Sequence, residues 1–225
     1  MIVIHGGGWD SGSRAELPQL DHWIADHGYA VAAIDYRLAP RWAWPAQADD
    51  LRAAIAYVKT HAKQLGVNPK KLVLFGRSAG GQIASAYAYQ AHDAAIRGVV
   101  AFYSPHDLRF AWIYARPDDV LNSALLLKQY TGGTPDTVGR VYDSASALLH
   151  VSEDSPPTLL IHGELDTLVW NRQSERLSTV LDRKGVRHYF LSLPWATHAF
   201  DYNLNGPGGQ LATYALAHFL LTTTH

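Results

Sequence analysis

Short apolar runs alternate with longer amphipathic stretches along most of this chain. The runs are apolar at successive positions, as in parallel strands that are buried on both faces of a sheet. Six of them predict strands, at residues 1–4, 29–36, 71–76, 96–104, 157–163 and 187–194.

The amphipathic stretches predict helices over residues 15–27, 46–65, 79–91, 171–184 and 209–221. In the second stretch, Leu51, Ile55 and Val58 recur at spacings of four and three residues, which places them on one helix face. Gly66 follows this stretch as a helix stop signal. Such strand–helix alternation predicts an α/β fold, with a mostly parallel central sheet between two layers of helices.

Residues 104–156 break the alternation between two predicted strands. A connection of about fifty residues is longer than an ordinary crossover. We therefore expect a helical insertion near the functional site, within a single α/β domain formed by residues 1–225.

Composition narrows the class of protein further. The chain has 225 residues, of which 48% are apolar, enough for one sizeable core. A net charge of −1 with dispersed basic residues argues against nucleic-acid binding. The lack of cysteine excludes disulfides, thiolate metal sites and cysteine nucleophiles. No apolar run reaches the roughly 18 residues of a membrane span, and no signal peptide is evident, so we expect a cytoplasmic protein without a membrane partner.

Residues 76–80 read Gly-Arg-Ser-Ala-Gly and lie between a predicted strand and a predicted helix. In this setting the pattern predicts a sharp, strained turn that exposes the serine hydroxyl. A phosphate-binding turn is the alternative, because helix N-termini also bind phosphate. Both glycine-rich phosphate-binding motifs are missing here, so the pattern favours Ser78 as a nucleophile.

A serine nucleophile needs a histidine base and a carboxylate that orients it. Asp166 follows the predicted strand 157–163 and has better reach than its neighbour Glu164. Of the twelve histidines, His198 lies beyond this acid in the loop after the last predicted strand. The chain order Ser78, Asp166, His198 is that of α/β-hydrolases.

The segment HGGGW at residues 5–9 follows the first predicted strand. Glycines let a ligand approach backbone N–H groups closely, which suits an oxyanion hole. Gly6 and Gly7 would then donate together with Ala79, the residue after the nucleophile. A flexible glycine loop without a role is the alternative for this segment alone.

Five motifs together resemble the hormone-sensitive-lipase-like branch of the α/β-hydrolases. They are HGGGW (5–9), DYRLAP (35–40), GRSAGG (76–81), HGELD (162–166) and HAF (198–200). Within this branch the chain looks most similar to bacterial carboxylesterases related to acetyl-xylan and feruloyl esterases. The resemblance implies hydrolysis of short-chain esters through an acyl-serine, without a metal or other cofactor. Because no cap precedes HGGG and the 104–156 insertion is too polar for a lipase lid, we expect acetyl to butyryl esters. It assigns the same triad and oxyanion hole, and a structural role to Asp35.

Three aromatic residues near these motifs are candidates for the substrate pocket: Trp9, Trp195 and Phe200. The expected substrate is a small-molecule or carbohydrate-linked ester. The same triad would also serve an aryl formamide or amide hydrolase. A non-catalytic binding protein on the hydrolase scaffold is the third possibility, since fold does not fix function.

The chain departs from the family in having almost nothing before HGGG, where relatives carry two strands and often cap helices. The expectation is a truncated start, or a fold that does without this part. The strand at 29–36 would then become a sheet edge with no lysine, proline or bulge inside it to prevent pairing. We therefore expect a homo-oligomer formed through this edge, or else a rearranged segment that covers it.

Overall fold

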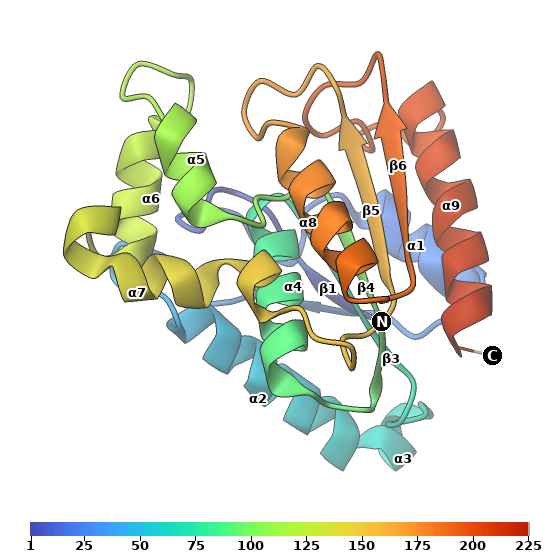
Figure 1. The fold of residues 1–225 in the computed structure, drawn as a ribbon. Helices are drawn as coiled ribbons and strands as arrows, with labels where there is room; N and C mark the ends of the chain where they lie inside the picture. The colour runs from blue at the N-terminus through green and yellow to red at the C-terminus, as the bar shows by residue number, and fades with distance from the viewer. Residues whose placement is uncertain (225) are drawn as a thin grey trace.

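The computed structural model describes residues 1–224 and contains one parallel sheet of six strands with helices on both faces (Figure 1). The strand order is β2-β1-β3-β4-β5-β6. All six predicted strands are present and every neighbouring pair is parallel: β1 (Ile2–Ile4), β2 (Ala32–Ile34), β3 (Leu72–Arg77), β4 (Ile96–Phe102), β5 (Thr158–Gly163) and β6 (His188–Leu193). The α/β prediction is confirmed.

The five predicted helices are also present, although one of them is divided into two helices. The stretch 46–65 forms α2 (Ala46–Thr60) and a short α3 (Ala62–Leu65) instead of one helix. Gly66 ends it in the left-handed conformation, with φ of 67°, as its position predicted. The other four are α1 (Pro18–Asp26), α4 (Ala79–Ala91), α8 (Arg172–Arg183) and α9 (Pro207–Thr224).

The segment between β4 and β5 is helical, as expected for the insertion. It forms α5 (Leu108–Tyr114), α6 (Ser123–Thr131), α7 (Pro135–Ala145) and a 3₁₀ turn at Ala147–His150. Asp107 and Asn122 cap α5 and α6 by accepting hydrogen bonds from backbone N–H groups of the first turn. In Figure 1, α5, α6 and α7 lie together beside the sheet and its helices, at the left.

Alternate residues of the strands pack into two cores, one on each face of the sheet. Ile2, Ile4 and Leu74 pack with α2, α4 and α8, while Val3 and Phe75 pack with α1 and α9. This period of two accounts for strands that are apolar at every position. No helix of residues 1–224 is long and apolar enough to cross a membrane.

Strand β2 lies at the edge of the sheet, as predicted, but it is shorter than the predicted 29–36. The chain leaves the sheet after Ile34 because Asp35 accepts hydrogen bonds from the backbone and guanidinium of Arg14, at 2.7 and 2.6 Å. Tyr36 then turns toward the first glycine loop, where its hydroxyl donates to the carbonyls of His5 and Gly6. Only three residues therefore form the edge.

Association of two chains through β2 stays a prediction. Within the described residues β2 pairs only with β1, so its outer backbone groups are available to another strand. We expect light scattering after size exclusion to give a mass of at least twice 24.8 kDa. A monomer at all concentrations up to about 100 μM, well above usual dimer dissociation constants, would contradict this prediction.

Candidate active site

Ser78 occupies a strained turn between β3 and α4. Its φ of 51° and ψ of −121° lie in a region that L-residues other than glycine rarely adopt. The turn is held because the Ser78 N–H donates to the carbonyl of Phe102 on β4, at 2.9 Å. The strain predicted from the sequence motif is therefore present at this residue.

Two glycines make this turn possible. A Cβ atom on Gly80 would lie 2.2 Å from the carbonyl oxygen of Ile4, and one on Gly76 would lie 2.2 Å from the carbonyl carbon of Gly80. Both distances are far below van der Waals contact, so only glycine fits at either position. Helix α4 can thus begin directly against the ends of β1 and β3.

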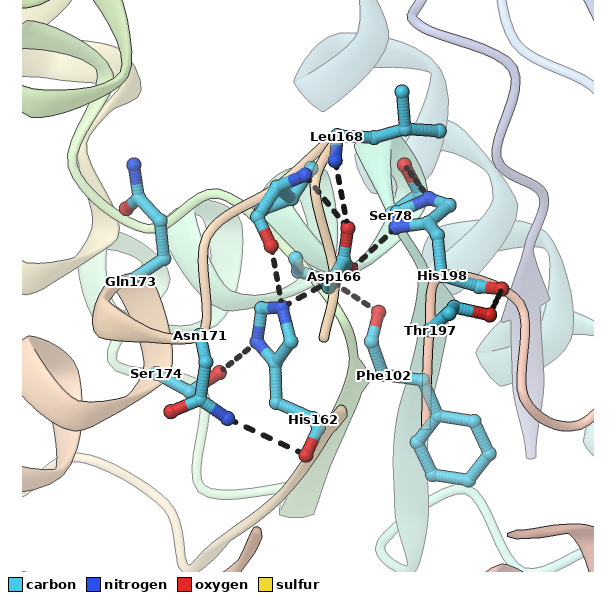
Figure 2. Close-up of polar contacts among 12 residues, drawn as sticks. Ser78, Phe102, His162, Asp166, Leu168, Asn171, Gln173, Ser174, Thr197 and His198 are labelled. Atoms are coloured by element: carbon cyan, nitrogen blue, oxygen red, sulfur yellow. Dashed lines mark hydrogen bonds and ion pairs between the residues drawn. The ribbon is translucent and has the colours of Figure 1, made fainter. Parts of the chain in front are cut away.

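His198 and Asp166 lie beside Ser78 in a continuous hydrogen-bonded row (Figure 2). His198 Nδ1 donates to Asp166 Oδ2 at 2.6 Å, and His198 Nε2 lies 3.2 Å from Ser78 Oγ. Asp166 follows β5 and His198 follows β6, so both come from carboxyl ends of parallel strands, at the same sheet edge as Ser78. The structure thus brings together the three residues that the sequence indicated.

The carboxylate of Asp166 is buried and ionised. Burial raises its pKa, but hydrogen bonds from His162, His198 and the Val169 N–H more than compensate and lower the pKa to about 2. Oδ1 accepts from the N–H groups of Leu168 and Val169, both at 2.9 Å. Glu164, the competing acid, is exposed and accepts a hydrogen bond from Ser192.

The first glycine loop lies against the nucleophile. A Cβ atom on Gly6 would be 3.4 Å from Ser78 Cβ, and Gly7 has a φ of 93°. The loop carbonyls are engaged elsewhere: Gly6 O accepts from Tyr36 and His5, and Gly7 O accepts from Ser11. These hydrogen bonds fix the orientation of the loop carbonyls and do not involve the N–H groups of Gly6 and Gly7. Ala79 is the first residue of α4, where N–H groups have no partner within the helix.

Two cavities meet at Ser78. The larger, about 420 Å³, also contacts His198, the glycine loop and a wall of Val120, Leu121 and Leu126. The smaller, about 50 Å³, lies on the Ala79 side and is mostly apolar. A bigger cavity of about 800 Å³ lies elsewhere, between α2 and α4, and holds none of the triad residues.

The structure places one of the three candidate pocket residues beside the cavities at Ser78 and the other two away from them. Trp9 lines the smaller cavity, although its ring is mainly buried against Tyr130 and its Nε1–H donates to Gln82. Trp195 is 54% exposed and Phe200 packs on Phe102 and Tyr103, so neither lines the two cavities at Ser78. Proximity to His198 in sequence misled here, because the side chains leave the loop in different directions.

A parallel sheet, a serine on a strained strand–helix turn and a hydrogen-bonded acid and histidine after later strands define an α/β-hydrolase. The solved structures similar to this chain agree with that class. The chain belongs to the BD-FAE family, whose model matches residues 1–181.

Several relatives of this chain are named as esterases or ester hydrolases. The chain is 30% identical over 220 residues to a probable carboxylic ester hydrolase, LipM, of Mycobacterium tuberculosis, with 89% of this chain and 49% of LipM covered. It is 31% identical to an ethyl acetate hydrolase of Pseudomonas putida, covering 89% of this chain and 65% of the relative. The chain thus spans about half the length of LipM and of an esterase, LipQ, from the same organism.

Solved structures resemble almost the whole chain. An esterase from Pyrobaculum calidifontis superimposes with a TM-score of 0.84 at 26% identity, covering 100% of this chain and 76% of the esterase. A truncated carbohydrate esterase from gut microbiota also gives 0.84, at 24% identity, covering 99% and 85%. The second likeness supports the fold alone.

A buried ion pair that sequence reasoning missed joins the two halves of the site. Arg77 Nε donates to Asp201 Oδ2 at 2.6 Å, and the side chains are 5% and 0% exposed. Tyr103 donates to the other carboxylate oxygen at 2.6 Å, while its ring centroid lies 4.5 Å from that of His198. Burial lowers the pKa of Arg77, but the charge of Asp201 and the hydrogen bond to it, together with nearby Tyr103 and Asp21, outweigh burial and keep that pKa raised. The one sequence signal for this contact is position: Arg77 lies within the GRSAGG motif and Asp201 directly follows the HAF motif.

We expect Asp201→Asn to lower the free energy of unfolding by about 3 kcal/mol or more, because the buried Arg77 charge loses its counter-charge. Asp35→Asn is the matched control. Its partner Arg14 is 67% exposed, so the expected loss there is below about 1 kcal/mol. Urea unfolding of both variants measures the difference, and equal losses would contradict this account.

Proposed function

We propose that this chain is a serine carboxylesterase that hydrolyses short-chain carboxylic esters, acetyl to butyryl, through an acyl-serine intermediate. The observation that carries this proposal is the hydrogen-bonded triad. Ser78 Oγ lies 3.2 Å from His198 Nε2, and His198 Nδ1 lies 2.6 Å from Asp166 Oδ2. The esterase names of the relatives support the same reaction.

In the first half of the proposed reaction, Ser78 Oγ attacks the ester carbonyl while His198 Nε2 takes its proton. Asp166 holds the imidazole with Nδ1–H toward the carboxylate and stabilises the imidazolium that forms. The carbonyl oxygen becomes an oxyanion, which the N–H groups of Gly6, Gly7 and Ala79 would bind. His198 then gives its proton to the leaving alcohol.

In the second half, water replaces the alcohol. His198 takes a proton from the water as it attacks the acyl-serine, and the oxyanion forms again in the same place. When the intermediate collapses, His198 returns the proton to Ser78 Oγ and the carboxylic acid leaves. Neither half needs a cofactor, since protons and electron pairs balance among substrate, water and the three side chains.

The cavities suggest which part of the ester lies where. The leaving alcohol must be within reach of His198, and His198 lines the larger cavity of about 420 Å³. The acyl group would then enter the cavity of about 50 Å³ beside Ala79, which is closed by Pro105, Ala111 and Leu127. A space this small suits a short acyl chain and leaves more room for the alcohol.

We expect p-nitrophenyl acetate and butyrate to be hydrolysed with kcat/KM at least tenfold above that for the palmitate, because the long chain exceeds the smaller cavity. Ser78→Ala removes the nucleophile and should lower kcat by about 10⁴-fold or more. An ester panel with the protein and this variant tests both points. Faster turnover of palmitate, or full activity of Ser78→Ala, would refute them.

We expect kcat/KM to rise between roughly pH 5 and pH 8, where a histidine base loses its proton. Asp166 has a pKa of about 2 and is ionised throughout this range. Because that value is below its ordinary one, the stabilisation from its charge is lost only in stronger acid, as pH falls toward 2. Burial and nearby His162 lower the pKa of His106 to about 3, so His106 stays neutral in this range and does not contribute to the pH dependence. A rate that is flat over this range, with the fold intact by circular dichroism, would exclude a histidine base.

A further inference from the structure

A second histidine contacts the carboxylate of Asp166. His162 lies on β5 four residues before Asp166, and both side chains are fully buried. Its Nε2 is 3.2 Å from Asp166 Oδ2 and 2.8 Å from the carbonyl oxygen of Val169 (Figure 2). The mechanism described above makes no use of this histidine.

The partners of His162 define where its proton lies. The carbonyl of Val169 can only accept, so Nε2 carries the hydrogen and donates it to Val169, while Asp166 Oδ2 lies 3.2 Å from the same nitrogen. Nδ1 then accepts a hydrogen bond from Ser174 on α8, at 2.8 Å. A neutral His162 therefore has both ring nitrogens paired, with its Nε2–H fixed on the acid loop.

Asp166 Oδ2 thus lies near one ring nitrogen of each histidine. The bond from His198, at 2.6 Å, carries the changing charge during catalysis, whereas His162 lies on the other side of the oxygen. Among the interactions that lower the pKa of Asp166 against the effect of burial, the hydrogen bond from His162 is the largest. Loss of His162 would remove the N–H that holds the Val169 carbonyl, and with it support for the loop whose Leu168 and Val169 N–H groups hold Asp166 Oδ1.

We propose that His162 is a positioning residue for the triad: its Nε2–H bonds the carbonyl of Val169 beside Asp166 Oδ2 and so holds the 166–169 loop, which keeps the carboxylate aligned with His198. This inference rests on the proposed esterase function. The competing interpretation is that His162 only ties β5 to α8 through Ser174 and contributes nothing to catalysis beyond stability.

Three substitutions at this position separate the two interpretations. In His162→Gln the amide nitrogen takes about the place of Nε2, in His162→Asn it takes about the place of Nδ1, and His162→Leu has no donor. We expect the Gln variant to keep kcat within about threefold, and the Asn and Leu variants to lose at least about tenfold with KM nearly unchanged, as misalignment costs rate more than binding. Equal kcat for the Gln and Asn variants would overturn the proposal.

A double-mutant cycle with Asp166→Asn tests whether His162 acts through the acid. If it does, His162→Leu should lower the rate of Ser78 labelling by a fluorophosphonate at least tenfold when Asp166 is present, and by less than twofold in the Asp166→Asn background. The same loss in both backgrounds would overturn the proposal. If all three His162 variants lose the fold by circular dichroism, the role is structural and the proposal fails as well.

His188 offers a closely matched control. It also lies on a strand next to α8, where it bonds Ser178 at 2.8 Å and the carbonyl of Val186 at 3.0 Å, and it has no contact with the triad. We expect His188→Leu to leave kcat within twofold, and a loss equal to that of His162→Leu would overturn the proposal. A wild-type chain that neither hydrolyses esters nor reacts with the fluorophosphonate would instead refute the proposed function itself.

Discussion

The close approach of backbone to backbone at the start of α4 is the constraint on which the site depends. Gly80 lies so near the carbonyl oxygen of Ile4 that an added Cβ atom would come within 2.2 Å of it. This contact places the turn with Ser78 beside the end of β1, and the first glycine loop follows directly from that end. The nucleophile and the proposed oxyanion donors are thus aligned by one packing contact, which is independent of any substrate.

The acid and histidine reach the same place by a different route. They sit on loops after β5 and β6, which pack so closely that a Cβ atom on Gly163 would lie 2.2 Å from the carbonyl oxygen of Ala196, and buried polar contacts add to this packing: Arg77 with Asp201, and His162 with Asp166. Buried charges need partners, because an unpaired one costs several kcal/mol. The two halves of the site are joined where Arg77, next to the nucleophile, meets Asp201, three residues after His198.

Much of the fold could be predicted from the sequence, because its signals are local. Apolar runs predicted all six strands, and the glycine pattern around Ser78 indicated the turn, since each follows from a few neighbouring residues. The extent of β2 was wrong because long-range bonds of Asp35 and Tyr36 end it. Likewise, the partners of Arg77 and His162, and the outward orientation of Trp195, depend on how distant loops meet. No periodicity in the chain encodes such contacts.

Much of the wall of the smaller cavity, and part of the wall of the larger one, come from a part of the chain that carries no triad residue. Leu121 and Leu126 line both cavities and belong to the segment between β4 and β5. Ser78, Asp166 and His198 are instead held by the sheet and its loops. The triad and part of the cavity walls are therefore encoded in separable parts of the gene. Exchange or gradual change of the α5–α6 region would reshape the cavities while Ser78, Asp166 and His198 keep their places.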